Sequence, residues 1–171
     1  MNLADYIRDV PNFPKPGILF RDITPMLANP QALGEATRQL AEQYRNQRID
    51  VVAAAEARGF IFATPLALEL GVGFVPIRKP GKLPCDTFSH EYELEYGTDT
   101  LQVHQDGVRP GQNVLLVDDL LATGGTMAAC CRLVEQTGAQ VAGCAFVIEL
   151  KGLDGKSKLA PRSVFSLIQY D

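Results

Sequence analysis

The chain has 171 residues, of which 46% are hydrophobic and 21% are charged, and its formal net charge at pH 7 is −4. These values fit one globular domain over residues 1–171 and give no general electrostatic attraction to nucleic acid. The N-terminal segment lacks the apolar stretch of a signal peptide, and no apolar run approaches the roughly 20 residues that cross a membrane. We therefore expect a cytoplasmic protein with reduced cysteines that binds neither nucleic acid nor membranes.

Segments with the periodicity of helices and of strands alternate along the chain. Helices are expected at residues 2–9, 30–48, 60–70 and 127–136, and strands at residues 50–55, 73–77, 113–117, 141–149 and 164–170. Residues 90–96 and 99–104 alternate in polarity and predict a hairpin that turns at Gly97. This order predicts an α/β fold, in which a twisted, mostly parallel sheet has helices on both faces and a flexible loop over one end.

Residues 114–126 carry the clearest chemical signal. Four apolar residues lead to the adjacent carboxylates Asp118 and Asp119, and a loop of small residues then precedes a helix. This loop comprises Ala122, Thr123, Gly124, Gly125 and Thr126. Its amides can point at one anion, and the helix dipole favours negative charge there, so the loop suits a phosphate. The carboxylates would repel phosphate and should face neutral hydroxyl groups such as those of a ribose, although strict strand alternation would let only one of them do so.

Two further segments place cations beside glycine. Residues 56–60, Glu-Ala-Arg-Gly-Phe, repeat the order of strand, turn and helix, and Arg58 can present a fork of donors to phosphate oxygens. Residues 78–84, Arg-Lys-Pro-Gly-Lys-Leu-Pro, place three cations within five residues. Such a cluster could hold a leaving group with several negative charges. Taken alone, residues 78–84 could equally be a solvated surface, and Arg58 could also be a surface residue at the start of a helix.

The sequence Val-Asp-Asp-Leu-Leu-Ala-Thr-Gly-Gly-Thr at residues 117–126 closely resembles the phosphoribosyl pyrophosphate (PRPP) motif of type I phosphoribosyltransferases, in the form found in members that use adenine. The resemblance extends in consistent order over residues 11–150. It implies that the small-residue loop binds the 5′-phosphate of PRPP and that the two acids bind the ribose hydroxyls. It also implies that Ala57, Arg58, Lys79 and Lys82 bind pyrophosphate and that Arg58 is catalytic. Ala57 stands where serine is commoner in the family, so this loop would rely on its backbone amides.

The same resemblance assigns roles to the hairpin and to the N-terminal segment. Residues 92–97, Tyr-Glu-Leu-Glu-Tyr-Gly, match the mobile loop of the family and make Glu95 the proposed acid/base group. Residues 1–25 would form most of a small hood over the base. Phe20 would stack on adenine, and Leu19 and Arg21 would offer main-chain hydrogen bonds.

The resemblance implies a purine salvage enzyme that transfers the phosphoribosyl group of PRPP to adenine, giving AMP and pyrophosphate. It also implies Mg²⁺ as cofactor, with no protein side chain assigned as its ligand, and a homodimer. Two alternatives stay open: a 6-oxopurine or xanthine phosphoribosyltransferase, and a non-catalytic regulator that senses PRPP. The hood and residues 92–97 argue against the first. The second would need a basic face or an added DNA-binding domain.

Overall fold

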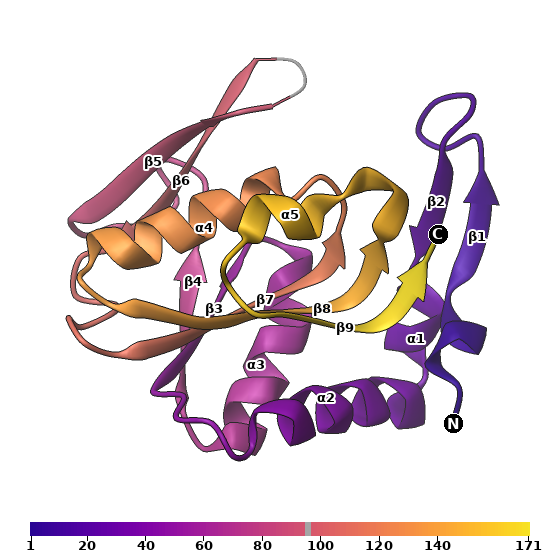
Figure 1. Ribbon diagram of the computed structural model, residues 1–171, viewed down its shortest axis with the longest axis horizontal. Helices are drawn as coiled ribbons and strands as arrows, with labels where there is room; N and C mark the ends of the chain where they lie inside the picture. Colours follow the sequence, from indigo (N-terminus) through magenta and orange to yellow (C-terminus); the bar gives the residue numbers. More distant parts are fainter. Residues whose placement is uncertain (95–96) are drawn as a thin grey trace.

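The computed structural model, which describes residues 1–94 and 97–171, is built around a five-stranded parallel sheet (Figure 1). The strands lie in the order β4 (Gly73–Ile77), β3 (Val51–Ala55), β7 (Asn113–Leu121), β8 (Gln140–Leu150) and β9 (Val164–Tyr170). The inner strands are apolar runs because both faces of the sheet are covered. The predicted α/β class with a mostly parallel sheet is confirmed.

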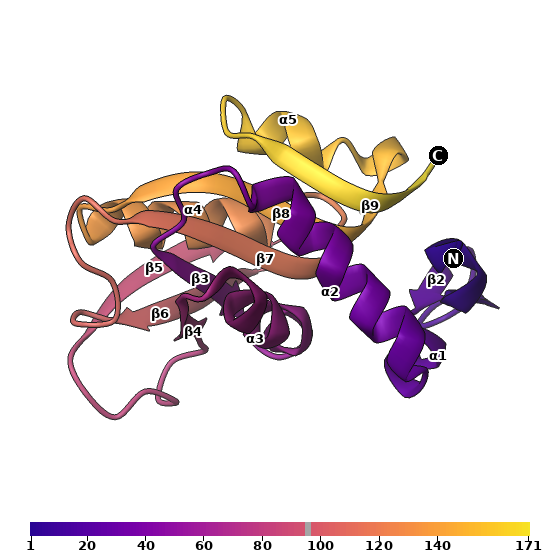
Figure 2. The same cartoon turned by 90° about the horizontal axis from the view of Figure 1, so that it is seen from below.

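Helices cover the two faces of the sheet separately (Figure 2). On one face lie α2 (Pro30–Tyr44) and α3 (Arg58–Leu70), and on the other lie α4 (Gly125–Gln136) and the short α5 (Gly155–Leu159). The side chains of β7 alternate between these faces, because Leu115 and Val117 pack with α2 and α3 whereas Val114 and Leu116 pack with α4. Each face therefore has its own apolar core.

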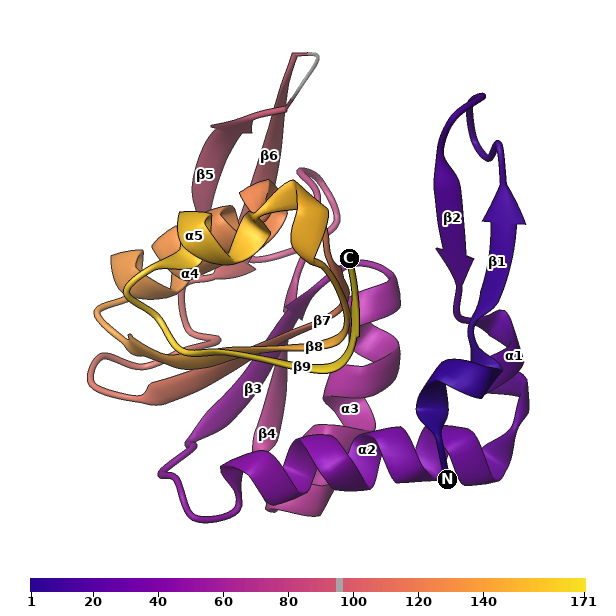
Figure 3. The same ribbon diagram turned by 45° about the vertical axis from the view of Figure 1, so that its right-hand side comes forward.

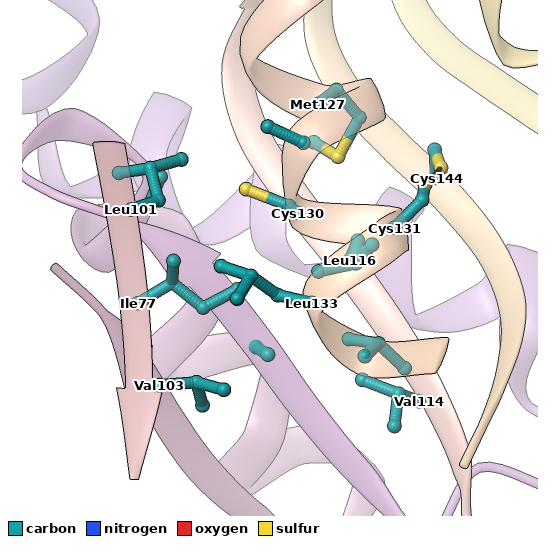
Figure 4. Close-up of a cluster of buried hydrophobic side chains, with 14 of the residues drawn as sticks. Ile77, Leu101, Val103, Val114, Leu116, Met127, Cys130, Cys131, Leu133 and Cys144 are labelled. Carbon is teal, nitrogen blue, oxygen red and sulfur yellow. Dashed lines mark hydrogen bonds between the residues drawn. The ribbon is translucent and has the colours of Figure 1, made fainter. Parts of the chain in front are cut away.

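The core under α4 fixes the helix that follows the small-residue loop (Figure 4). Met127, Cys130, Cys131 and Leu133 of α4 pack over Leu116, and all five are buried. Burying one such leucine stabilises the fold by about 1.5–3 kcal/mol. This packing holds the N-terminus of α4 against the end of β7.

Two antiparallel hairpins rise from the same side of the molecule (Figure 3). The first pairs β1 (Arg8–Pro11) with β2 (Leu19–Asp22), and the second pairs β5 (Thr87–Glu93) with β6 (Thr98–His104). Leu101 and Val103 anchor the second hairpin in the core under α4. Residues 95–96 lie outside the described residues.

Several predicted boundaries were wrong. Residues 2–9 form a 3-10 helix over Leu3–Tyr6 followed by β1, because hairpin pairing overrides the local preference. The helix expected at 30–48 ends at Tyr44, where the apolar positions end, and β7 continues to Leu121 instead of stopping at Val117. The short helices α1 (Thr24–Ala28) and α5 were not predicted. Among the described residues, no helix is long and apolar enough to cross a membrane.

Candidate active site

The two adjacent acids line one small cavity at the end of β7. The cavity has a volume of about 180 Å³, and Arg58, Asp118, Asp119 and residues 120–127 line it. Val117 and Leu120 are three residues apart and yet pack in the same core, so the two-residue alternation of the strand is interrupted between them. The expectation that only one carboxylate would face the ligand is therefore wrong, because both line the cavity.

The two carboxylates have different surroundings. The side chain of Asp119 is buried and forms an ion pair with Arg58, whose Nε lies 2.9 Å from Asp119 Oδ2. Asp118 Oδ1 accepts a hydrogen bond from the Asp119 backbone N–H at 2.9 Å. Removal from water, followed by the charge of Asp119, raises the pKa of Asp118 to about 8. At neutral pH the Asp118 carboxyl group of the unliganded site therefore holds a proton, while the Asp119 side chain is paired with Arg58.

The loop after β7 has the geometry of an anion site. Gly124 has a φ of +80°, a conformation that favours glycine, and α4 begins at the next residue without a side-chain cap. The first amides of α4 therefore have no partner within the helix and can donate to a ligand. Gly125 is not in the left-handed region, and a Cβ there would meet only the Glu93 carbonyl oxygen at 4.0 Å. Gly125 thus keeps the space in front of these amides open.

Glu56 links the two basic segments, a role that the sequence analysis missed. Its Oε1 accepts hydrogen bonds from the backbone N–H of Lys79 at 2.9 Å and from Arg78 Nε at 3.1 Å. The pKa of Glu56 is lowered, chiefly by the Lys79 amide. The loop that contains Ala57 and Arg58 is therefore tied to the loop that contains Lys79. The sequence signal that could have predicted this role is the position of Glu56, an acidic residue directly after a buried strand.

The predicted cations do not all enter the cavity. Lys79 forms an ion pair with Asp99 of β6. Tyr92 of β5 lies between this pair and the small-residue loop, because its hydroxyl is 3.4 Å from Asp99 Oδ2 and 3.4 Å from Thr126 Oγ1. Lys82 is exposed, and among the described residues its side chain makes no hydrogen bond or ion pair. The second hairpin thus holds Lys79, but not Lys82, near the loop.

The first hairpin approaches the cavity through Phe20. The guanidinium carbon of Arg58 lies 5.9 Å from the centre of the Phe20 ring, and Phe13 packs edge-on against the same ring at 5.2 Å. Leu19 is 44% exposed, which fits an apolar binding surface that has no ligand on it. Arg21 is ion-paired with Asp9 and lies 3.7 Å from the ring centre of Tyr170 in β9. The side chain of Arg21 is therefore engaged by Asp9 and Tyr170, so a ligand would contact Arg21 through its main chain. The predicted acid/base residue, Glu95, lies outside the described residues.

Comparison with known proteins agrees with this geometry. Residues 24–170 match the family model of the phosphoribosyl transferase domain. The chain is 60% identical over 170 residues to adenine phosphoribosyltransferase from Rhodopirellula baltica, covering 99% of this chain and 82% of that protein. It is 58% identical to the adenine phosphoribosyltransferase of Chloroflexus aurantiacus, covering 99% and 98% of the two chains.

Solved structures give the same result. The crystal structure of adenine phosphoribosyltransferase from Thermoanaerobacter pseudethanolicus superposes with a TM-score of 0.95 at 52% identity, covering 98% of each chain. The Saccharomyces cerevisiae enzyme, complexed with adenine and an imino-altritol bisphosphate, superposes with a TM-score of 0.89 at 45% identity, covering 96% of each chain. The chain therefore belongs to the phosphoribosyl transferase domain family and, within it, to the adenine phosphoribosyltransferases. The comparisons give no support to a 6-oxopurine enzyme or to a regulator.

Proposed function

We propose that this enzyme transfers the phosphoribosyl group of PRPP to adenine in purine salvage, giving AMP and pyrophosphate. The observation that carries the proposal is the cavity in which two carboxylates, Arg58 and the first, uncapped turn of α4 meet. Such a cavity offers donors to a phosphate and acceptors to ribose hydroxyls within one site. The adenine-bound yeast relative supports the choice of base.

In this proposal the 5′-phosphate lies in the loop of Ala122, Thr123, Gly124, Gly125 and Thr126. The ionised Asp119 accepts a hydrogen bond from one ribose hydroxyl, and the neutral Asp118 can donate to a ribose oxygen or accept after losing its proton. Because Arg58 neutralises Asp119, the phosphate is not repelled by two full charges.

Pyrophosphate binds to the other side of the ribose. Arg58 and the amides around Ala57 contact it, and Lys79 and Lys82 approach from the neighbouring loop. Glu56 holds the two loops together and acts through them, without contacting substrate. To reach pyrophosphate, Lys79 exchanges its contact with Asp99 for contact with the ligand.

Adenine binds under the first hairpin, stacked on Phe20, with its edge read by the main chain of Leu19 and Arg21. In the described part of the chain, β2 has a partner strand on one edge only, so the other edge has free backbone groups. As the bond from the anomeric carbon to pyrophosphate breaks, an adenine nitrogen forms the new bond to that carbon. Glu95 accepts the proton that adenine loses. Catalysis comes from positioning and electrostatic stabilisation of the oxocarbenium-like state.

The donor set fits Mg²⁺ as a cofactor bound mainly by substrate oxygens. Carboxylate oxygens suit this ion, but Arg58 already contacts Asp119, and Asp118 holds a proton at neutral pH. The two acids would therefore contact the ion through water or after deprotonation. When bound, Mg²⁺ neutralises the charge of the departing pyrophosphate.

Family membership supports two further proposals, which concern the oligomeric state and the cellular location. We propose a homodimer, and the exposed apolar side chains Ile61 and Leu68 on α3 are suited to a subunit contact. We also propose a cytoplasmic location. The Sγ atoms of Cys131 and Cys144 lie 3.7 Å apart as free thiols, a state that a reducing compartment maintains.

The direct test is turnover of labelled adenine with PRPP and Mg²⁺. We expect AMP and pyrophosphate in equal amounts and no product when PRPP is omitted. Product from guanine or xanthine but not from adenine would contradict the proposal. Binding of PRPP without any turnover would favour a regulator.

A further inference from the structure

The C-terminal segment returns to the small-residue loop and touches its backbone. A Cβ added to Gly155 would lie 2.2 Å from the Ala122 carbonyl oxygen, and one added to Gly124 would lie 2.5 Å from the Gly155 carbonyl oxygen. Leu159, at the other end of α5, is fully buried in the core under α4. Because both ends of α5 are fixed, this helix has a defined position beside the loop (Figure 1).

A second cavity, of about 470 Å³, lies between α5, the loop and the second hairpin. Lys158 of α5 lines it together with Glu93, Leu94, Thr123, Gly125 and Thr126. The last three of these residues also line the small cavity that contains Asp118 and Asp119. Lys158 therefore lies beside the small-residue loop, in a cavity that Asp118 and Asp119 do not line.

The charges around the loop show what Lys158 can contribute. A phosphate monoester carries between one and two negative charges at neutral pH, yet residues 120–127 contain no cationic side chain. Arg58 is paired with Asp119, and Lys79 is paired with Asp99. Within residues 1–94 and 97–171, Lys158 has no ion-pair partner. Glu93, which lines the same cavity, would oppose an anion if no cation stood beside it.

We propose that Lys158 is a further binding residue for the 5′-phosphate, supplying the positive charge that the loop itself lacks. The inference rests on the proposed function in one respect: it takes the phosphate of PRPP and AMP to occupy the loop. The amides of α4 fix the position of the phosphate, and Lys158 neutralises the charge of the phosphate and offsets that of Glu93. The C-terminal segment is thereby part of the substrate site.

The test compares Lys158→Met with Lys156→Met. Lys156 is a matched control because it lies on the same helix, is exposed and does not line the cavity. Calorimetric titration would measure the dissociation constants for AMP, ribose 5-phosphate and adenosine. We expect Lys158→Met to weaken AMP and ribose 5-phosphate about 10-fold to 100-fold, the usual range for a lost charged hydrogen bond. Adenosine, which has no phosphate, should bind to the parent and to both variants alike.

A second readout distinguishes direct contact from a structural role. A cation beside the phosphate lowers the pKa of bound AMP, so a phosphorus NMR titration should show this pKa rising in Lys158→Met and unchanged in Lys156→Met. Equal AMP affinity in Lys158→Met and the parent would overturn the inference and leave the proposed function intact. Equal losses for AMP and adenosine would also overturn it. A parent enzyme that binds neither AMP nor ribose 5-phosphate would overturn the proposed function as well.

Discussion

Asp118 and Asp119 are neighbours in β7, but among the residues that the structure describes only Asp119 forms an ion pair with a cation. Replacing both by asparagine keeps their shape and removes the charged acceptors proposed to bind the ribose hydroxyls, which are Asp119 and, once it has lost its proton, Asp118. Each charge-assisted hydrogen bond contributes about 1.5–3 kcal/mol, so kcat/KM for PRPP should fall by one to several orders of magnitude. Steady-state kinetics, with thermal unfolding as the folding control, measure the effect. A folded double variant with the kinetics of the parent would refute the assignment.

The raised pKa of Asp118 also predicts how stability depends on pH. An unfolded aspartate has a pKa of about 3.9, whereas Asp118 in the folded protein keeps its proton up to about pH 8. The protonated Asp118 carboxyl group therefore stabilises the folded state fully when the pH is below the pKa of the unfolded state. This stabilisation is lost as the pH rises through the pKa of the folded state, about 8. The melting temperature of the unliganded parent should fall between pH 5 and pH 9, relative to that of Asp118→Asn. Parallel pH profiles for the two proteins would show that Asp118 titrates normally.

At the scale of the element, two adjacent glycines in the loop between β7 and α4 have different roles. Gly124 carries the left-handed backbone, whereas Gly125 keeps space open for a ligand. Gly125→Val should therefore fold and lose AMP binding, while Thr126→Ala should bind AMP more weakly because it removes one hydroxyl among several amides. Calorimetric titration of AMP and circular dichroism check both variants. Normal AMP affinity in Gly125→Val would mean that the phosphate lies elsewhere.

The elements also show what the sequence could predict. The alternating pattern predicted the sheet, and the acids with the small-residue loop predicted the anion site, because both signals depend on neighbouring residues. The contact of Gly155 with Ala122 and Gly124 could not be predicted, since a glycine that permits close approach resembles any turn glycine. Val117 and Leu120 pack in the same core and both acids line one cavity, an arrangement that depends on packing against elements distant in the sequence. Glu56 likewise acquires its partners only when β3 and β4 are adjacent.

In the whole molecule, the parallel sheet carries the phosphoribosyl site, and the two hairpins rise beside it (Figure 3). In the proposed function, the loops at the end of the sheet bind PRPP and the first hairpin selects the base. We propose that this selection depends on hydrogen bonds between the base and the main chain of Leu19 and Arg21. Adenine presents an amino donor at C6 and an acceptor at N1, whereas hypoxanthine presents a carbonyl acceptor and an N–H donor. A main chain placed for adenine would therefore meet like groups on hypoxanthine.

The ratio of kcat/KM for adenine to that for hypoxanthine, measured with saturating PRPP and Mg²⁺, tests this account most directly. Each buried hydrogen bond left unmade costs about 1–3 kcal/mol, and 1.4 kcal/mol is about tenfold, so two mismatches predict a ratio of at least about one hundred. Values within tenfold of each other would contradict adenine selection by the first hairpin and would favour a 6-oxopurine enzyme.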